Sequence, residues 1–278
     1  MIRAFKLEWL KVKNYRVFWI LFGLYLLVQL FITNGGIFVL QWLESKGADF
    51  DGIKPSIIPI YDFPDIWQNS VWLASFPKVL VSFIVVVSVN NELTYNTLRQ
   101  NVIDGISKKE FLLSKFSLII FLAGICTIVL FLSGLAAGFT YSHVTDVKYI
   151  FQDLEFLLAY FLQLVAFCLF AFCIALMIKK GGFAIVGIII YSIFQLIFTS
   201  ILEFSPYTKD TVGHFVKFLP IYSIESLTGK IYKSPFARYL LQEIQTDVLW
   251  YQWAIVIAWI GIFSLIITYI LNKKDLKA

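Results

Sequence analysis

Six long runs of apolar residues, separated by polar segments, set the pattern of this 278-residue chain. A helix rises about 1.5 Å per residue, so about 20 apolar residues are enough to cross the roughly 30 Å hydrocarbon core of a membrane. The pattern therefore predicts an all-α integral membrane protein with six transmembrane helices. We place these spans near residues 17–40, 71–89, 112–139, 156–178, 183–202 and 250–271.

We expect residues 1–278 to form a single transmembrane domain, in which the polar segments separate successive parts. The parts we expect are an interfacial helix in 1–16, spans one and two in 17–89, a polar segment in 90–110, spans three to five in 111–202, an exoplasmic segment in 203–249, and span six with a short tail in 250–278. The exoplasmic segment carries Pro206, Pro220 and Pro235 between semi-apolar pieces. This composition favours short helices at the membrane surface over a disordered linker.

The first 16 residues have an amphipathic pattern. Ile2, Phe5, Trp9 and Val12 fall on one stripe of a helix, and charged residues occupy most of the remainder. This pattern predicts a helix that lies in the membrane interface before the first span. An ordinary basic flank that only sets the orientation of the first span is an equally good interpretation of the stripe.

The segment 90–110 is longer than a turn between two helices requires, since such connections commonly take about 2–8 residues. Ser107 and Glu110 match a capping box at the start of the third span. Between residues 94 and 103, Leu98, Val102 and Ile103 have the spacing of a short helix with one apolar face. We expect this helix to dock on another protein, because a solvated surface turn, the alternative, would leave its apolar face without a partner.

The composition agrees with a membrane protein, with 59% hydrophobic and 15% charged residues and a mean hydropathy of +0.80, whereas soluble domains carry about 25% charged residues. We expect the interiors of the spans to carry no Asp, Glu, Lys, Arg or His, which argues against an ion-coupled carrier or an intramembrane protease. The sequence has no nucleotide-binding loop of the form GxxxxGK[ST], and its histidines and cysteines form no metal-ligand pattern. We therefore expect no catalytic residue, metal or cofactor in this chain, and do not expect it to be an enzyme.

Lysine and arginine are distributed unevenly between two sets of flanks. Fourteen of the 23 lie in residues 1–16, 90–115, 179–180 and 273–278, whereas most of the 18 acidic residues lie in the other flanks. Because cytoplasmic flanks carry the excess of positive charge, we expect both termini and residues 90–110 to be cytoplasmic. This orientation needs an even number of spans, in a multi-pass protein of the cell (inner or plasma) membrane. The lysine and arginine residues are spread along the membrane flanks, so we expect no nucleic-acid partner.

Three glutamines, Gln29, Gln163 and Gln195, lie within the predicted spans. They are candidates for contact with a substrate in its pathway. The alternative, which we favour, is that they form hydrogen bonds between helices, which are worth about 0.6–2 kcal/mol in a membrane.

A set of residues around the second and third spans recurs in a known family. Glu92 is followed by Thr97-Leu98-Arg99, then by Asp104-Gly105-Ile106-Ser107 and Lys108-Lys109-Glu110 at the start of the long third span. In this order, with six spans, a basic N-terminal helix and a long outer segment that contains Leu219-Pro220, the chain resembles permease subunits of the ABC type-2 transporter family. The resemblance extends over most of the chain.

The resemblance implies a transmembrane subunit of an ATP-driven transporter, an exporter, with ATP and magnesium bound by a separate ABC ATPase subunit. A second permease subunit, identical or different, would complete the pathway across the lipid bilayer. Residues 94–103 would be the coupling helix that docks on the ATPase, and residues 215–245 would cap the exit route. The ATPase-coupling residues implied in this way are Glu92, Thr97, Leu98, Arg99, Val102, Asp104 and Gly105.

The same resemblance implies alternating access, in which we expect spans two and three to act as uninterrupted, near-rigid levers. An apolar pathway would suit lipid-like cargo, peptides or hydrophobic drugs. The alternative function is that of a non-transporting membrane scaffold, such as an assembly or immunity subunit, and an ion-coupled carrier is less well supported.

Overall fold

The computed structural model describes residues 2–47, 60–95, 100, 107–144, 146–178, 180–204, 216–228 and 247–273. All regular secondary structure in these ranges is helical, which confirms the predicted all-α class. In chain order the helices are α1 (Ile2–Lys13), α2 (Arg16–Ser45), α3 (Asp65–Ala74), α4 (Lys78–Thr94), α6 (Lys108–Tyr141), α7 (Val147–Ile150), α8 (Glu155–Ile178), α9 (Gly181–Phe204), α11 (Pro220–Ser226) and α13 (Trp250–Lys273).

Each predicted apolar stretch falls on one helix or on one closely spaced pair of helices. The first, third, fourth, fifth and sixth stretches lie in α2, α6, α8, α9 and α13, and the second lies in α3 and α4. Among the described residues, four helices are long and apolar enough to cross a membrane, and the pair α3–α4 makes a fifth if it counts as one bent span. The apolar part of α9 measured in the same way, Gly181–Gln195, is shorter.

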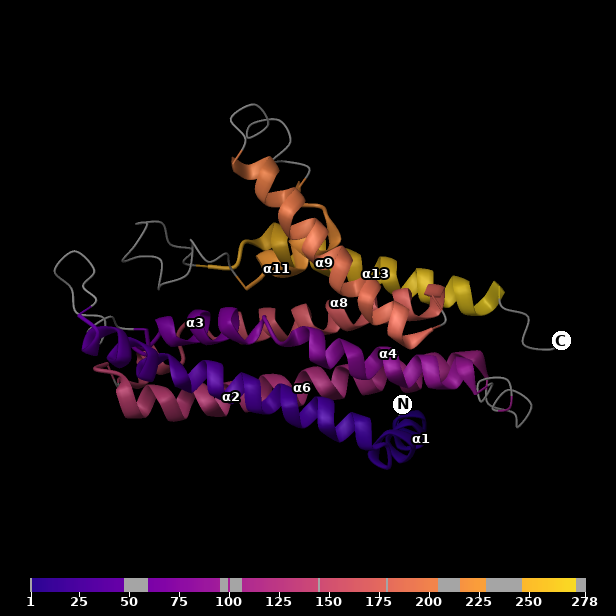
Figure 1. Cartoon of the computed structure of the whole chain (residues 1–278), viewed down its shortest axis with the longest axis horizontal. Coiled ribbons are helices and arrows are strands. Elements are labelled where there is room, and N and C mark those ends of the chain that lie inside the picture. The colour runs from indigo at the N-terminus through magenta and orange to yellow at the C-terminus, as the bar shows by residue number, and fades with distance from the viewer. Residues whose placement is uncertain are drawn as a thin grey trace.

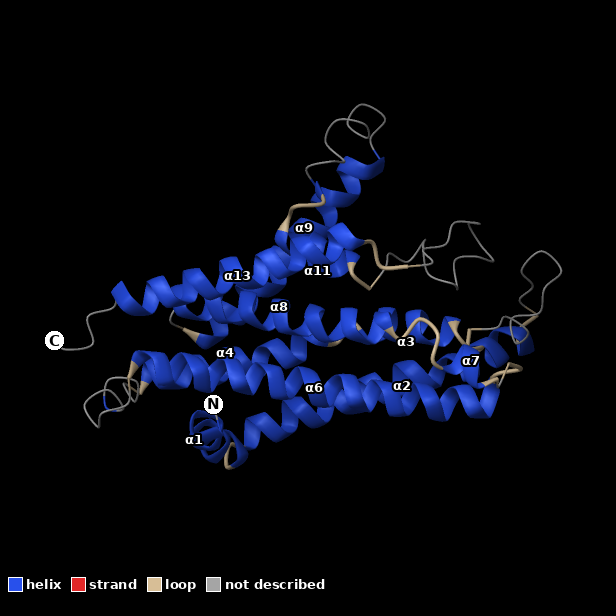
Figure 2. Cartoon of the chain, turned by 180° about the vertical axis from the view of Figure 1, so that it is seen from behind, coloured by secondary structure: helices blue, strands red, loops and turns tan. Residues whose placement is uncertain are grey.

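Helix α8 lies at the centre of the bundle. Its most apolar stretch is 72% buried, compared with 28% in α2 and 22% in α13. Helices α4, α6 and α13 pack against α8, and α2 packs on α4 and α6 from outside (Figure 1). Helix α9 leans away from the bundle beside α11, as both views show (Figure 2). The apolar composition of α8 alone does not select its central position, because α9 and α13 are also strongly apolar but expose much of their surface, which lipid tails can cover.

The second span is interrupted, and the expectation of an uninterrupted lever is wrong for it. α3 ends at Ala74, α4 begins at Lys78, and the two helices are bent by 45°. Pro77 stands directly before α4. Proline has no backbone N–H and disfavours helical geometry in the residue before it, so the helix breaks at this point. In contrast, α6 runs for 34 residues without a break.

Close contacts with two glycines hold α3 and its preceding turn against α6. A Cβ atom at Gly134 would lie 2.8 Å from the Trp67 ring, and one at Gly138 would clash with the Phe63 ring. Trp67 is fully buried, and its Nε1–H donates a hydrogen bond of 2.9 Å to the Ile150 carbonyl. The glycines therefore let two aromatic rings lie directly on the α6 backbone.

One end of the bundle gathers α1, the end of α4, the start of α6, the α8–α9 turn and the end of α13 (Figure 1). Lys108 Nζ donates a hydrogen bond of 2.9 Å to the Leu271 carbonyl, which ties α6 to the last turn of α13. These elements belong to the flanks that carry the excess of lysine and arginine. We call this end, built from residues 2–16, 88–95, 107–115, 180 and 270–273, the basic end.

Candidate functional site: a buried ion cluster

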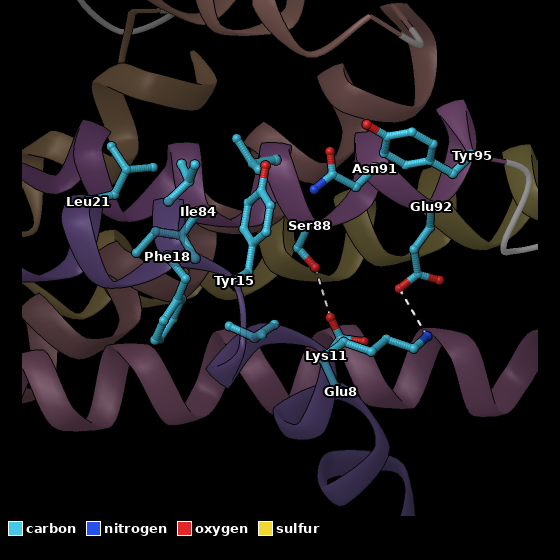
Figure 3. Close-up of a pocket in the computed structure, with 13 residues that line it drawn as sticks. Glu8, Lys11, Tyr15, Phe18, Leu21, Ile84, Ser88, Asn91, Glu92 and Tyr95 are labelled. Carbon is cyan, nitrogen blue, oxygen red and sulfur yellow. Dashed lines mark hydrogen bonds and ion pairs between the residues drawn. The ribbon is translucent and has the colours of Figure 1, made fainter.

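A cluster of ionic and polar side chains joins three helices at the basic end. Lys115 Nζ of α6 lies 2.6 Å from Glu8 of α1, 2.7 Å from Glu92 of α4 and 2.7 Å from the Ser88 hydroxyl. The Ser88 hydroxyl donates a hydrogen bond of 2.8 Å to Glu8, and Lys11 reaches Glu92 at 3.2 Å (Figure 3). We call these five residues the ion cluster.

The ion cluster lies almost entirely inside the protein. The side chains of Lys115 and Glu8 are each 1% exposed and that of Glu92 is 7% exposed, whereas that of Lys11 is 42% exposed. An ammonium group has three N–H donors, and Glu8, Ser88 and Glu92 accept from all three. Removal of one partner from a buried ion pair typically costs about 3–5 kcal/mol, because the remaining charge stays buried.

Helical spacing explains how each element presents its part of the cluster. Glu8 and Lys11 lie three residues apart on α1, and Ser88 and Glu92 lie four residues apart on α4, so each pair shares one face of its helix. Lys115 lies two turns into α6. The three helices therefore bring together local pairs that are far apart in the sequence.

Two opposing effects act on the pKa of Glu8. Burial raises the pKa of this carboxyl, but the Lys115 ammonium, together with the hydrogen bonds from Lys115 and Ser88, outweighs the burial and leaves the pKa lowered from its ordinary value of 4.5. Glu8 is therefore ionised at neutral pH, and its contact with Lys115 is an ion pair.

The apolar stripe predicted for the first helix faces the protein in its described part. The rings of Phe5 and Trp9 lie 4.9 and 5.4 Å from the Phe121 ring of α6, measured between centroids. Val12 is 6% exposed. The helix forms where the pattern predicts it, but much of its apolar face packs on α6.

The start of α6 is capped as the sequence predicts. The Ser107 hydroxyl accepts a hydrogen bond of 3.2 Å from the Glu110 backbone N–H, and the Glu110 carboxylate accepts one of 2.9 Å from the Ser107 N–H. This reciprocal pair is the predicted capping box. It fixes where the chain re-enters the helix that carries Lys115.

Most of the residues implied as ATPase contacts lie outside the described residues: Thr97, Leu98, Arg99, Val102, Asp104 and Gly105. Glu92 is described, and it is 5% exposed with its carboxylate in the ion cluster. A direct contact between Glu92 and another protein therefore stays a prediction. No local pattern identifies its partners Lys11 and Lys115, because they lie 81 and 23 positions away in the chain.

The three glutamines are buried, and each bonds to another element. Gln29 Nε2 donates to the Cys126 carbonyl at 3.2 Å, and Gln163 Nε2 donates to the Thr228 hydroxyl at 3.2 Å. The Gln195 side chain accepts from the Ile221 N–H at 3.3 Å. These contacts fit the interpretation as hydrogen bonds between helices. The role of the glutamines in a substrate pathway stays a prediction.

The expectation that the spans carry no ionisable side chain is wrong. Lys115 lies inside α6 with 1% of its side chain exposed, and Lys78 at the start of α4 is 7% exposed. Lys78 Nζ lies 3.4 Å from the Glu225 carboxylate of α11 and 5.4 Å from the centre of the Phe167 ring. Both lysines are visible in the sequence within predicted spans, but their partners become apparent only in the fold. The buried lysines remove the reason for disfavouring an ion-coupled carrier that was based on missing charges.

A model of a known protein family matches the part of the chain that contains this site. The family model described as "ABC-2 family transporter protein" matches residues 4–199, more than two thirds of the chain. The matched range contains the whole ion cluster and both ends of the segment between α4 and α6. None of the curated proteins matches the chain.

Proposed function

This chain belongs to the ABC-2 transporter family, and we propose that it is the transmembrane subunit of an ATP-driven exporter that draws its energy from a separate ATPase subunit. Membrane proteins of this family work with ABC ATPases. In the proposal, ATP and magnesium are bound and ATP is hydrolysed in that partner, while this chain forms the substrate pathway. The remaining partners are a second permease subunit, identical or different, and the lipid bilayer.

The proposed topology has six spans with both termini in the cytoplasm of a cell membrane. The bent pair α3–α4 counts as span two and α9 as span five in this arrangement. The gathering of the basic flanks at one end of the fold supports it, because positively charged flanks remain on the cytoplasmic side. The short helix α11 then lies towards the exoplasmic side, within the segment that we expect to cap the exit route.

The ion cluster supports a coupling role for residues 90–110. This segment contains Glu92, near the end of α4, and leads into α6, which carries Lys115 two turns from its start; the two side chains lie 2.7 Å apart. A displacement of the segment by the ATPase would therefore move the ends of α4 and α6 together, because a buried ion pair resists separation. The break at Pro77 limits the stiff part of span two to α4, so movement would be transmitted along Lys78–Thr94 and along the unbroken α6.

A purification experiment tests this function. The tagged chain is expected to bring down an ABC ATPase in stoichiometric amount, with an ATP turnover that depends on this chain. Arg99→Glu should reduce the recovery of the ATPase, whereas Lys148→Glu, at an exposed lysine on the opposite side of the fold, should not. Recovery of a stable complex without any ATPase would contradict transport and support the non-transporting scaffold.

A further inference from the structure

A cavity of about 180 Å³ lies beside the ion cluster, between α1, α2 and α4. Its lining changes character from one end to the other (Figure 3). Phe18, Leu21 and Ile84 lie together at one end, and Asn91 and Tyr95 lie at the other, near the Lys11–Glu92 pair. The cavity is therefore amphipathic along its length, and it fits a ligand with a polar head and an apolar chain.

The direction of this change matches the direction of the membrane in the proposed topology. Ile84 and Tyr95 are 11 residues apart on or next to α4, a rise of about 16 Å. The polar end lies at the start of α2, where the chain enters the bilayer, and the apolar end lies deeper along α2 and α4. The polar end is thus at the level of the lipid headgroups, and the apolar end is at the level of the acyl chains.

The charge at the polar end favours an anionic head. Glu8 and Glu92 both line the cavity, and Lys11 and Lys115 balance their two negative charges, so the ion cluster adds no net negative charge at this end. Lys11 is 42% exposed at the mouth. Lys13 and Arg16, which flank lining residues, are exposed and form no ion pair within the described ranges. The Asn91 side chain also lines the cavity without a hydrogen-bond partner among the described residues, so it is available as a donor.

We propose that this cavity binds an anionic phospholipid of the cytoplasmic leaflet. The phosphate lies between Lys11 and Asn91, and the first part of one acyl chain lies against Phe18, Leu21 and Ile84. A cavity of this size is smaller than the roughly 300 Å³ of a typical ligand pocket, so the rest of the lipid stays in the bilayer. The phosphate shares Lys11 with Glu92 and so changes the charge balance beside the segment that leads to the ATPase. The proposal rests on the proposed orientation of the protein.

Lipid binding to the purified full chain, without any ATPase, tests the site. Phosphatidylglycerol is expected to bind more tightly than phosphatidylethanolamine, as measured by native mass spectrometry in detergent. Lys11→Gln should weaken the binding of phosphatidylglycerol by about fivefold, which is the effect of one basic residue at an anionic surface. Leu21→Trp, which fills the apolar end without a change of charge, should weaken the binding of both lipids. Lys148→Gln, which removes one positive charge at a distant exposed site, should leave the binding of both lipids unchanged.

Several outcomes would overturn the proposal. Equal binding of the two lipids, or wild-type binding by both Lys11→Gln and Leu21→Trp, would show that no anionic-lipid site lies here. Full competition by inorganic phosphate would show a phosphate site without a lipid requirement. A thermal melt of each variant separates loss of the site from loss of the fold. Because no ATPase is present, failure of this test is distinct from failure of the proposed transport function.

Discussion

The Lys115 ammonium lies 2.6 Å from the Glu8 carboxylate, although the two residues are 107 positions apart in the chain. The pair attaches α1 to α6 inside the protein, and the contact of Lys115 with Glu92 attaches α4 to the same cation. The first helix is therefore part of the bundle at the point where the chain leaves α4 for the proposed coupling segment.

Replacement of Lys115 by methionine should release α1 from the bundle. The change leaves the carboxylates of Glu8 and Glu92 buried without their shared cation, at a cost of about 3–5 kcal/mol. We expect faster tryptic cleavage in α1 and faster hydrogen exchange of its amides. Lys109→Met is the matched control, because Lys109 is exposed in the first turn of the same helix. Equal protection of α1 in both variants would mean that the ion cluster does not hold this helix.

The attachment of α1 should persist from pH 8 to about pH 5 and weaken below that range. Burial raises the pKa of Glu8, but Lys115 outweighs it and lowers the pKa below 4.5. A lowered carboxyl pKa stabilises the fold at pH values above the unfolded pKa, and this contribution is lost as the pH falls through the folded pKa. Hydrogen exchange in α1, measured across this range, checks the prediction.

Glu8→Gln supplies the control for the pH experiment. This variant cannot lose the Glu8 charge, so its acid transition should become smaller while other carboxyls still titrate. An acid transition of the same size in Glu8→Gln would assign the effect to other groups.

The sequence predicted those parts of the fold that depend on neighbouring residues. Apolar runs of about 20 residues indicated where the long helices lie, and the Ser107–Glu110 cap joins residues only three positions apart. The break at Pro77 and the charge of Lys78 were also visible locally, but the high average hydropathy of this stretch concealed both. Proline acts on backbone geometry, and an average over side chains does not record it.

The ion cluster could not be predicted in the same way. Glu8 has the appearance of one acid in a basic, amphipathic helix, and Lys115 that of a flank residue. Their pairing depends on how α1 folds back onto α6, and no periodicity within either helix contains this information. The glutamines pose the same problem, since the partners of Gln163 and Gln195 lie 65 and 26 positions away.

A larger residue at Gly134 should destabilise the packing of α3 on α6. A Cβ atom there would lie 2.8 Å from the buried Trp67 ring, and overpacking of a tight core typically costs about 1–3 kcal/mol. We expect Gly134→Val to lower the melting temperature of the detergent-solubilised protein. Gly124→Val on the same helix is the control, because nothing lies within 4 Å of a Cβ atom there. Similar melting temperatures for the two variants would refute the close contact.

Glu92→Gln should distinguish two roles of Glu92: direct contact with the ATPase, which the resemblance implies, and pairing with Lys115 in the ion cluster, which the fold shows. If Glu92 acts within the ion cluster, the variant still binds the ATPase, but less substrate is transported per ATP, because α4 and α6 no longer share a full ion pair at the coupling segment. The cluster places the Glu92 carboxylate 2.7 Å from Lys115, so we expect this result. ATPase recovery, ATP turnover and transport are measured together in reconstituted vesicles, with Arg99→Glu as the variant expected to lose recovery. Loss of ATPase recovery in Glu92→Gln, with the protection of α1 unchanged, would instead mean that Glu92 contacts the ATPase directly.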